Sequence, residues 1–203
     1  MRVPPWDGAA LDALDAELRS VFRPGELITA DDVRRGALTL QQSVLRLGWL
    51  PLRAARGRVM FLMDTNPGPI SATYTAGRPS LQGRVLFTYA RPGSPDATFV
   101  KRNDPTGAAL AEIRRLVRAG YLVRTRSDEP LATVLSGDAT RLRAALASGA
   151  KLVSTDFPEV GMTARYDRDY VAALPGVAQG RCNAVIRRPA CRSRRLERER
   201  VRR

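Results

Sequence analysis

Three short apolar runs in the second half of the chain each end abruptly in polar residues. The runs at 97–101, 121–125 and 151–154 lead into Asn-Asp-Pro, Ser-Asp and Thr-Asp-Phe-Pro respectively. Segments with apolar residues at helical spacing, 106–119 and 138–147, separate them. A strand–helix–strand succession lays its strands parallel, so the three polar clusters meet at the carboxyl edge of one sheet. Ligands of α/β proteins bind at that edge, and the pattern therefore predicts a functional rim there.

The first half of the chain carries weaker signals of the same class. Helices are predicted at 8–22 and 39–47, and continuous apolar runs of buried-strand length at 58–63 and 84–89. Strands and helices thus alternate at the spacing of βα units. Four or five strands are too few to close an eight-stranded barrel, so the pattern predicts either a small open sheet or half of a larger barrel.

The charge of the chain is concentrated at its end. Residues 187–203 hold nine arginines and two glutamates. Their net charge of +7 is half of the chain's formal charge of +14. We predict that residues 1–186 form the folded domain and that 187–203 form a basic, disordered tail. The remaining body is only mildly basic, and this argues against a nucleic-acid-binding function. The chain contains no histidine.

The composition also bears on the compartment. No stretch reaches the roughly 18 apolar residues of a membrane-spanning helix, and the first residues lack the apolar region of a signal peptide. Taken literally, this predicts a cytoplasmic protein. Cys182 and Cys191 suit a small surface disulfide in an exported protein and two reduced thiols in a cytosolic one, and both alternatives remain open. An ordinary structural zinc site has no ligand set here.

Two arginines provide the main candidate for chemistry. Arg124 and Arg126 alternate along one predicted strand, so both side chains leave the same face about 7 Å apart. Such a pair can grip the oxygens of a phosphate, and Lys101, at the end of the preceding strand, can add a third positive charge. Asp128 lies two residues beyond Arg126, and a buried network of ion pairs with Asp156 or Asp64 would explain the same residues without a ligand.

Carboxylates end two other strands. Asp64 follows the run at 58–63, and Asp156 follows the run at 151–154 just before a proline. Each can hold a substrate hydroxyl or a cationic side chain, and each can equally cap a loop. Asn103 and Asp104 precede a proline and are better explained as turn formers.

Several of these segments together resemble the calcium-dependent phosphoinositide phospholipase C-like family. They are RGRVMFLMD (56–64), ATFVKRNDP (97–105), GYLVRTRSD (120–128), ALASGAKLVSTDFP (145–158) and RCNAV (181–185), and the similarity runs from about residue 8 to residue 192. The Ser-Thr-Asp-aromatic-Pro element also resembles the last barrel strand of the wider phosphodiesterase group. The resemblance implies a (βα)8 barrel that cleaves phosphodiester lipid headgroups, of which this chain would form the C-terminal half.

In that family the catalytic histidines and most calcium ligands lie on early barrel strands, so none of them is carried over to this chain. The resemblance implies headgroup or phosphate binding by Lys101, Arg124 and Arg126, with Asp64 and Asp156 as supporting carboxylates. It implies Ca²⁺ for the intact family, and relatives that are usually secreted. We therefore expect a fragment that does not cleave alone and is completed by another half-barrel or by self-association. The alternative is a non-catalytic binding module for anionic lipid headgroups.

Overall fold

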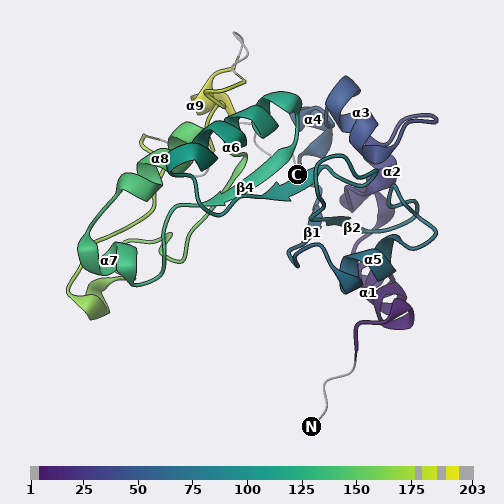
Figure 1. Cartoon of the computed structure of the whole chain (residues 1–203), viewed down its shortest axis with the longest axis horizontal. Helices are drawn as coiled ribbons and strands as arrows, with labels where there is room; N and C mark the ends of the chain where they lie inside the picture. Colours follow the sequence, from purple (N-terminus) through teal and green to yellow (C-terminus); the bar gives the residue numbers. More distant parts are fainter. Residues whose placement is uncertain (1–4, 177–179, 187–190, 197–203) are drawn as a thin grey trace. The chain divides into compact units, whose positions relative to one another are not determined.

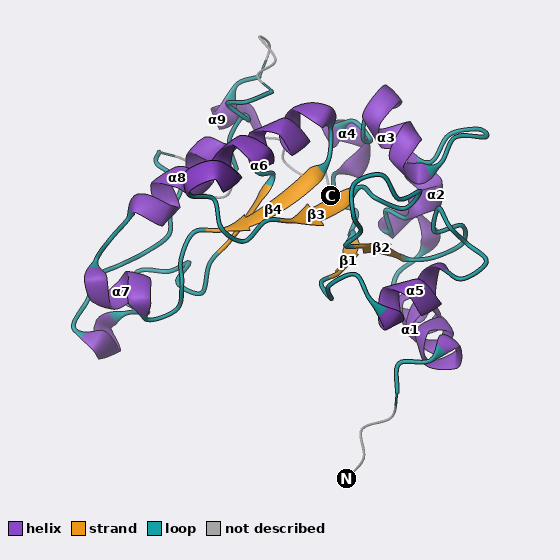
Figure 2. Ribbon diagram, in the orientation of Figure 1, coloured by secondary structure: helices purple, strands orange, loops and turns teal. Residues whose placement is uncertain are grey.

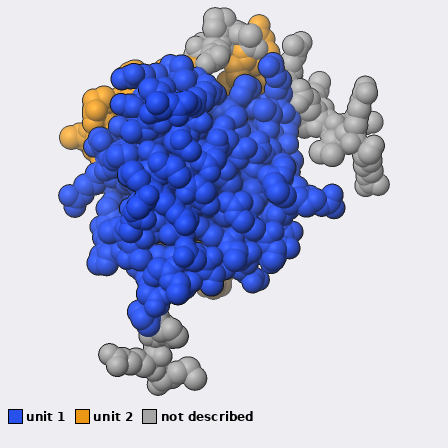
Figure 3. Space-filling model, turned by 90° about the vertical axis from the view of Figure 1, so that its right-hand side faces the viewer, with its two compact units in different colours: residues 1–100 blue, residues 101–203 orange. Residues whose placement is uncertain are grey.

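The computed structural model describes residues 5–176, 180–186 and 191–196, and its chain is mixed α/β (Figure 1). It divides into two compact units, residues 1–100 and 101–203, which Figure 3 colours separately. The described strands form two short parallel sheets and no closed barrel. The predicted α/β class with parallel strands is confirmed.

The first unit begins with helices and continues with two strands. Its elements are α1 (Gly8–Val21), η1 (Pro24–Glu26), α2 (Ala30–Val33), α3 (Leu40–Leu47), α4 (Leu52–Ala55), β1 (Phe61–Met63), α5 (Pro69–Thr75) and β2 (Leu86–Thr88). The Asp7 carboxylate accepts a hydrogen bond from the amide of Ala10 at 2.9 Å and caps α1. The short helix α5 was not predicted, because its Pro and Thr residues and the preceding Gly68 are typical of loops.

The strands of this unit follow one another in parallel. Strand β1 pairs with β2, from Phe61 opposite Leu86 to Met63 opposite Thr88. Isolated parallel bridges extend the succession on both sides, with Leu27 opposite Val59 and Tyr89 opposite Phe99. Residues 26–28 therefore provide a parallel segment that has no counterpart in the predicted strands, since an extended stretch this short has no detectable alternation.

A buried network anchors the amino end of β2 to α1. The hydroxyl of Tyr74 donates to Asp15 at 2.5 Å and accepts from the amide of Leu86 at 3.0 Å. The guanidinium of Arg84 lies over the Tyr74 ring and pairs with Asp15 and Asp12. Burial and the neighbouring Asp15 carboxylate raise the pKa of Tyr74 well above its usual value. These hydrogen bonds and ion pairs tie α1, α5 and the start of β2 together.

The second unit carries the predicted rhythm of strand and helix. Its sheet has the order β3-β4-β5, and the last residue of β3, Lys101, belongs to this unit. Its elements are the end of β3 (Phe99–Lys101), α6 (Gly107–Ala119), β4 (Leu122–Arg126), α7 (Ala132–Ser136), α8 (Thr140–Ser148), β5 (Leu152–Ser154), η2 (Ala164–Tyr166) and α9 (Ser193–Leu196). Strands β4 and β5 are parallel, with Arg124 opposite Leu152 and Arg126 opposite Ser154.

Helices cover one face of this sheet, and on the other, which we call the open face, the described side chains of β4 and β5 are partly buried or exposed. Helices α6 and α8 pack against β4 and against each other (Figure 2). Along β4, Val123 and Thr125 are fully buried, whereas Arg124 and Arg126 are only partly buried. Because side chains alternate along a strand, the buried pair faces the helices and the arginines lie on the opposite face.

The helix ends show where local signals were sufficient. Gly120, Gly137 and Gly149 are left-handed residues that end α6, α7 and α8. The helix predicted at about 138–147 is present as α8 but begins two residues later, and Asp138 before it accepts a hydrogen bond from the amide of Thr140 at 2.8 Å. An Asx side chain can form such a turn as readily as an N-cap, and sequence spacing does not separate the two.

The C-terminal segment is fastened to the end of α8. A disulfide joins Cys182 to Cys191, and the Asn183 amide donates to the carbonyl of Gly149 at 2.6 Å. Of the tail predicted to be disordered, 187–190 and 197–203 lie outside the described residues. Within it, Ser193–Leu196 form the short helix α9. No described helix is long and apolar enough to cross a membrane.

Candidate functional site

The carboxyl edge of β4 presents two guanidinium groups on the open face of the sheet. Arg124 and Arg126 are two positions apart and both are partly buried. Helix α6 feeds β4 through the Gly120 turn, where the amide of Tyr121 donates to the carbonyl of Leu116 at 3.2 Å. The tight return of the chain places the arginines, rather than the apolar Val123, away from the helix layer.

Lys101 lies beside Arg124. The amide of Arg102 donates to the carbonyl of Arg124 at 2.9 Å. In a parallel ladder the residue before such a donor stands opposite the acceptor residue, and opposite residues project to the same face. Lys101 and Arg124 therefore share one row of the open face, and Arg126 stands one row nearer the carboxyl edge. The three cations predicted from the sequence come from neighbouring strands.

Asp156 is the carboxylate that lies next to this group. It follows β5 on the same face as Ser154, which is opposite Arg126. One oxygen of Asp156 lies 3.3 Å from a terminal nitrogen of Arg126, and about half of the Asp156 side chain is exposed. For this pair, the ion-pair alternative of the sequence analysis is therefore realised. The pair is open to solvent, so it stabilises the fold little and leaves Arg126 available to a competing anion.

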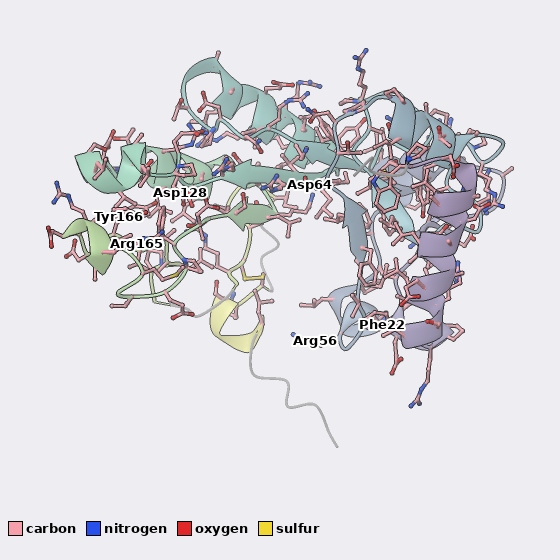
Figure 4. All side chains as sticks on the ribbon, turned by 90° about the horizontal axis from the view of Figure 1, so that it is seen from below. Phe22, Arg56, Asp64, Asp128, Arg165 and Tyr166 are labelled. Carbon is pink, nitrogen blue, oxygen red and sulfur yellow. A yellow bond between two sulfur atoms is a disulfide. The ribbon has the colours of Figure 1, made fainter. Side chains whose placement is uncertain are left out.

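A second carboxylate, Asp128, follows the end of β4. It is fully buried and accepts hydrogen bonds from Ser127 Oγ at 2.8 Å and Thr155 Oγ1 at 2.5 Å (Figure 4). The backbone amide of Asp156 approaches the same carboxylate at 3.4 Å. Asp128 thus ties the ends of β4 and β5 together through hydroxyl groups. Burial, and secondarily the charge of Asp128, raises the pKa of the nearby Tyr170.

The turn after β3 behaves as the sequence predicted and reveals one residue that it missed. Asp104 accepts from the amide and the hydroxyl of Thr106 at 2.9 and 2.7 Å, and these bonds hold its pKa below the usual value. The exposed Asn103 contributes its carbonyl, which accepts from Arg141 at 2.8 Å. Arg141 also pairs with Glu129 at 2.8 Å. Nothing in the local sequence distinguishes Arg141 from the other helix arginines.

Asp64 and Lys151 lie next to other strands than those that carry the three cations. Asp64 is exposed at the end of β1, in the first unit (Figure 4). Lys151 precedes β5, at the opposite end of the strand from Asp156, and its ammonium donates to the carbonyls of Tyr121 and Gly120. Burial lowers the pKa of Lys151 to about 8.

The described residues offer no evident metal centre. Among them, no three His, Cys, Asp or Glu side chains come close enough together to hold a metal ion. The donor set for a hard cation such as Ca²⁺ consists of several oxygen ligands around one point. Carboxylates clustered in that way are not found among the described residues, and no chemical step is assigned to calcium.

The chain was compared with known families, curated proteins and solved structures. The model of the family described as phosphoinositide phospholipase C, Ca²⁺-dependent, matches residues 1–184. No curated protein and no solved structure matched the chain. The family match covers the first unit and most of the second, and it includes every segment that carried the resemblance except the last residue of RCNAV (181–185). The chain belongs to the Ca²⁺-dependent phosphoinositide phospholipase C family.

Proposed function

We propose that Lys101, Arg124 and Arg126 bind the phosphate of a phosphodiester lipid headgroup, and that this polypeptide alone binds it without cleaving it. The observation that carries the proposal is that Lys101 and Arg124 stand opposite each other on neighbouring strands, with Arg126 two residues further along the same face. It rests on the 2.9 Å hydrogen bond from Arg102 to Arg124, which sets Lys101 beside Arg124. Family membership supplies the substrate class.

The chemistry of the three side chains suits a phosphate. Each guanidinium can donate two parallel hydrogen bonds to phosphate oxygens, and the ammonium adds a compact charge. Asp156, paired to Arg126 at 3.3 Å, is placed either to orient that arginine or to accept a hydrogen bond from a hydroxyl of the headgroup. We assign the same supporting role to Asp64 at the end of β1. In this proposal, the parallel segments of both units are strands of part of a (βα)8 barrel.

Cleavage needs more than charge. Attack of a hydroxyl on a phosphodiester requires a general base, a general acid for the leaving oxygen, and stabilisation of the developing charge. The chain has no imidazole to exchange protons near neutral pH. Lys151, with a pKa of about 8, precedes β5 and so stands at the wrong end of the strand to act on a phosphate at the carboxyl edge. We therefore assign only the third role to this polypeptide.

Calorimetric titration of the purified chain with myo-inositol 1-phosphate and with inorganic phosphate tests the binding. We expect saturable binding that weakens about tenfold or more in K101Q, R124Q and R126Q, since a charge-assisted hydrogen bond contributes roughly 1.5–3 kcal/mol. R115Q is the matched control, because Arg115 is exposed on α6, the helix side of the sheet. Binding that is absent, or equally weakened in R115Q, would remove the proposed site.

Two further measurements separate the proposal from its alternative. Incubation with a phosphoinositide should release no inositol phosphate, and robust release would refute the claim that the chain does not cleave. Flotation with vesicles tests the non-catalytic binding module: strong selectivity for phosphoinositide vesicles over those with another anionic lipid would favour that module. We expect only weak selectivity, because the three cations recognise phosphate and not a whole headgroup.

A further inference from the structure

Arg141 occupies a place that the proposed function does not yet use. It is the second residue of α8, and only about a sixth of its side chain is exposed. One terminal nitrogen donates to the carbonyl of Asn103 at 2.8 Å and lies 2.8 Å from a carboxylate oxygen of Glu129. The other lies 3.6 Å from Asp104. A single guanidinium thus contacts two loops that are separate in the sequence.

Those two loops directly follow the strands that carry the cations. Asn103 comes two residues after Lys101, and Glu129 comes three residues after Arg126. The carbonyl of Asn103 that Arg141 binds also accepts from the amide of Arg126 at 3.3 Å. The loop after β3, the loop after β4 and the backbone of Arg126 are therefore joined at one point. Displacement of Arg141 would release the carbonyl that Arg126 uses.

The fork of an arginine is what this junction requires. A guanidinium presents its donors in a fixed plane and can reach a carbonyl and two carboxylates at once. A lysine ammonium at the same position is a point charge on a flexible chain and does not fix several acceptors in one plane. The Nε atom of Arg141 is buried and has no partner among the described residues, so this orientation carries an unsatisfied donor. The contacts of the two terminal nitrogens must offset that cost.

We propose that Arg141 is a positioning residue of the anion site: by fastening the loops after β3 and β4 it holds Lys101 and Arg126 in their places. This inference rests on the proposed function. The hydrogen bond and ion pairs described for Arg141 are all with these two loops, so in this proposal it acts through the cations and not on the anion itself. Its loss should therefore weaken phosphate binding with little change in the melting temperature.

The test compares R141Q and R141K with R143Q, which makes the same charge change at an exposed arginine on the same helix. Affinity for inorganic phosphate is measured by calorimetry, and protection of the Arg126 amide by hydrogen exchange. We expect R141Q to lose about fivefold or more in affinity and to exchange the Arg126 amide faster. R141K should show a smaller loss, and R143Q should match the wild type.

Chemical rescue gives a readout that a general loss of stability would not produce. Millimolar guanidinium should restore part of the phosphate affinity of R141A and leave R143A unchanged. Wild-type affinity in both R141Q and R141K would overturn the role of Arg141 while the proposed function stood. A wild-type chain that binds no phosphate would overturn the proposed function, and the exchange of the Arg126 amide would still decide whether Arg141 fastens the loops.

Discussion

At the scale of single residues, the pair of Arg126 and Asp156 bears on how easily an anion would enter the proposed site. Its oxygen and nitrogen lie 3.3 Å apart and the carboxylate is half exposed. An anion at Arg126 must compete with this carboxylate and is repelled by its charge. The pair therefore opposes binding of a bare phosphate, although it can assist a ligand that carries hydroxyls.

We expect D156N to bind inorganic phosphate up to about fivefold more tightly than the wild type, as an exposed ion pair is worth roughly 0–1 kcal/mol. Calorimetric titration at low ionic strength measures the change. E159Q is the control, because Glu159 is exposed and the substitution removes the same charge three residues away. Equal or weaker phosphate binding in D156N would contradict the competition.

Lys151 gives the second prediction at this scale, which concerns pH. Burial lowers its folded-state pKa to about 8, from 10.5 in the unfolded chain. Between these values the unfolded state binds more protons, so the contribution of Lys151 to the free energy of unfolding rises with pH. Below pH 8 both states are charged and the burial penalty is fully present.

The difference in unfolding free energy between the wild type and K151M should therefore increase from pH 8 to pH 10 in favour of the wild type. Urea unfolding at a series of pH values measures it. K151R keeps its charge over this range and should show no such slope relative to K151M. If the unfolding free energy of the wild type changed with pH in parallel to that of K151M, the pKa of Lys151 would not be lowered in the folded state.

At the scale of elements, the glycines that end α7 and α8 form a natural pair for comparison. Gly137 and Gly149 both adopt left-handed conformations, with φ of +68° and +76°. A Cβ at Gly137 would meet nothing within 4 Å, whereas one at Gly149 would lie 2.5 Å from Val185 Cγ2. The C-terminal segment therefore packs onto a spot that only glycine leaves open.

G149A should be less stable than G137A by about 1–3 kcal/mol, because both lose the left-handed preference and only G149A overpacks against Val185. Chemical unfolding of both variants gives the difference. The amides of Val185 and Ile186 donate hydrogen bonds to the side-chain oxygen of Asn183. Their hydrogen exchange should accelerate in G149A alone. Similar losses in the two variants would mean that the segment does not dock on α8.

At the scale of the whole molecule, the outer strand of the second unit is the exposed feature. In the part of the chain that the structure describes, β5 pairs only with β4, and Leu152 on it is 38% exposed. Unpaired strand edges with apolar side chains promote association of copies. We expect the purified chain to self-associate through this edge.

L152K should reduce the associated fraction in size-exclusion chromatography with light scattering, because a charge on an edge strand opposes edge-to-edge pairing. V160K adds the same charge at a residue that is 84% exposed and outside the sheet, and it should leave the fraction unchanged. A wild-type chain that is monomeric at high concentration would refute the prediction.

Most of the local structure follows from the sequence by itself. The α/β class, the strands after residue 57, the helices at 107–119 and 140–148 and their glycine ends were predictable, because periodicity and capping are local signals. So was the common face of Arg124 and Arg126, which depends only on the alternation of a strand. The candidate cations were thus identified as a set before their neighbours were known.

Other features were decided by tertiary structure alone. Three contacts of this kind are the pairing of Asp156 with Arg126, the hydrogen bond from Thr155 to the buried Asp128 and the contact of Arg141 with Asn103. Each joins residues about 30 or more positions apart, and no local signal in the sequence indicates it. The parallel segment at 26–28 and the close approach of Val185 to Gly149 likewise exist only through their partners. Local patterns specify what each element is, whereas long-range contacts determine which side chains meet.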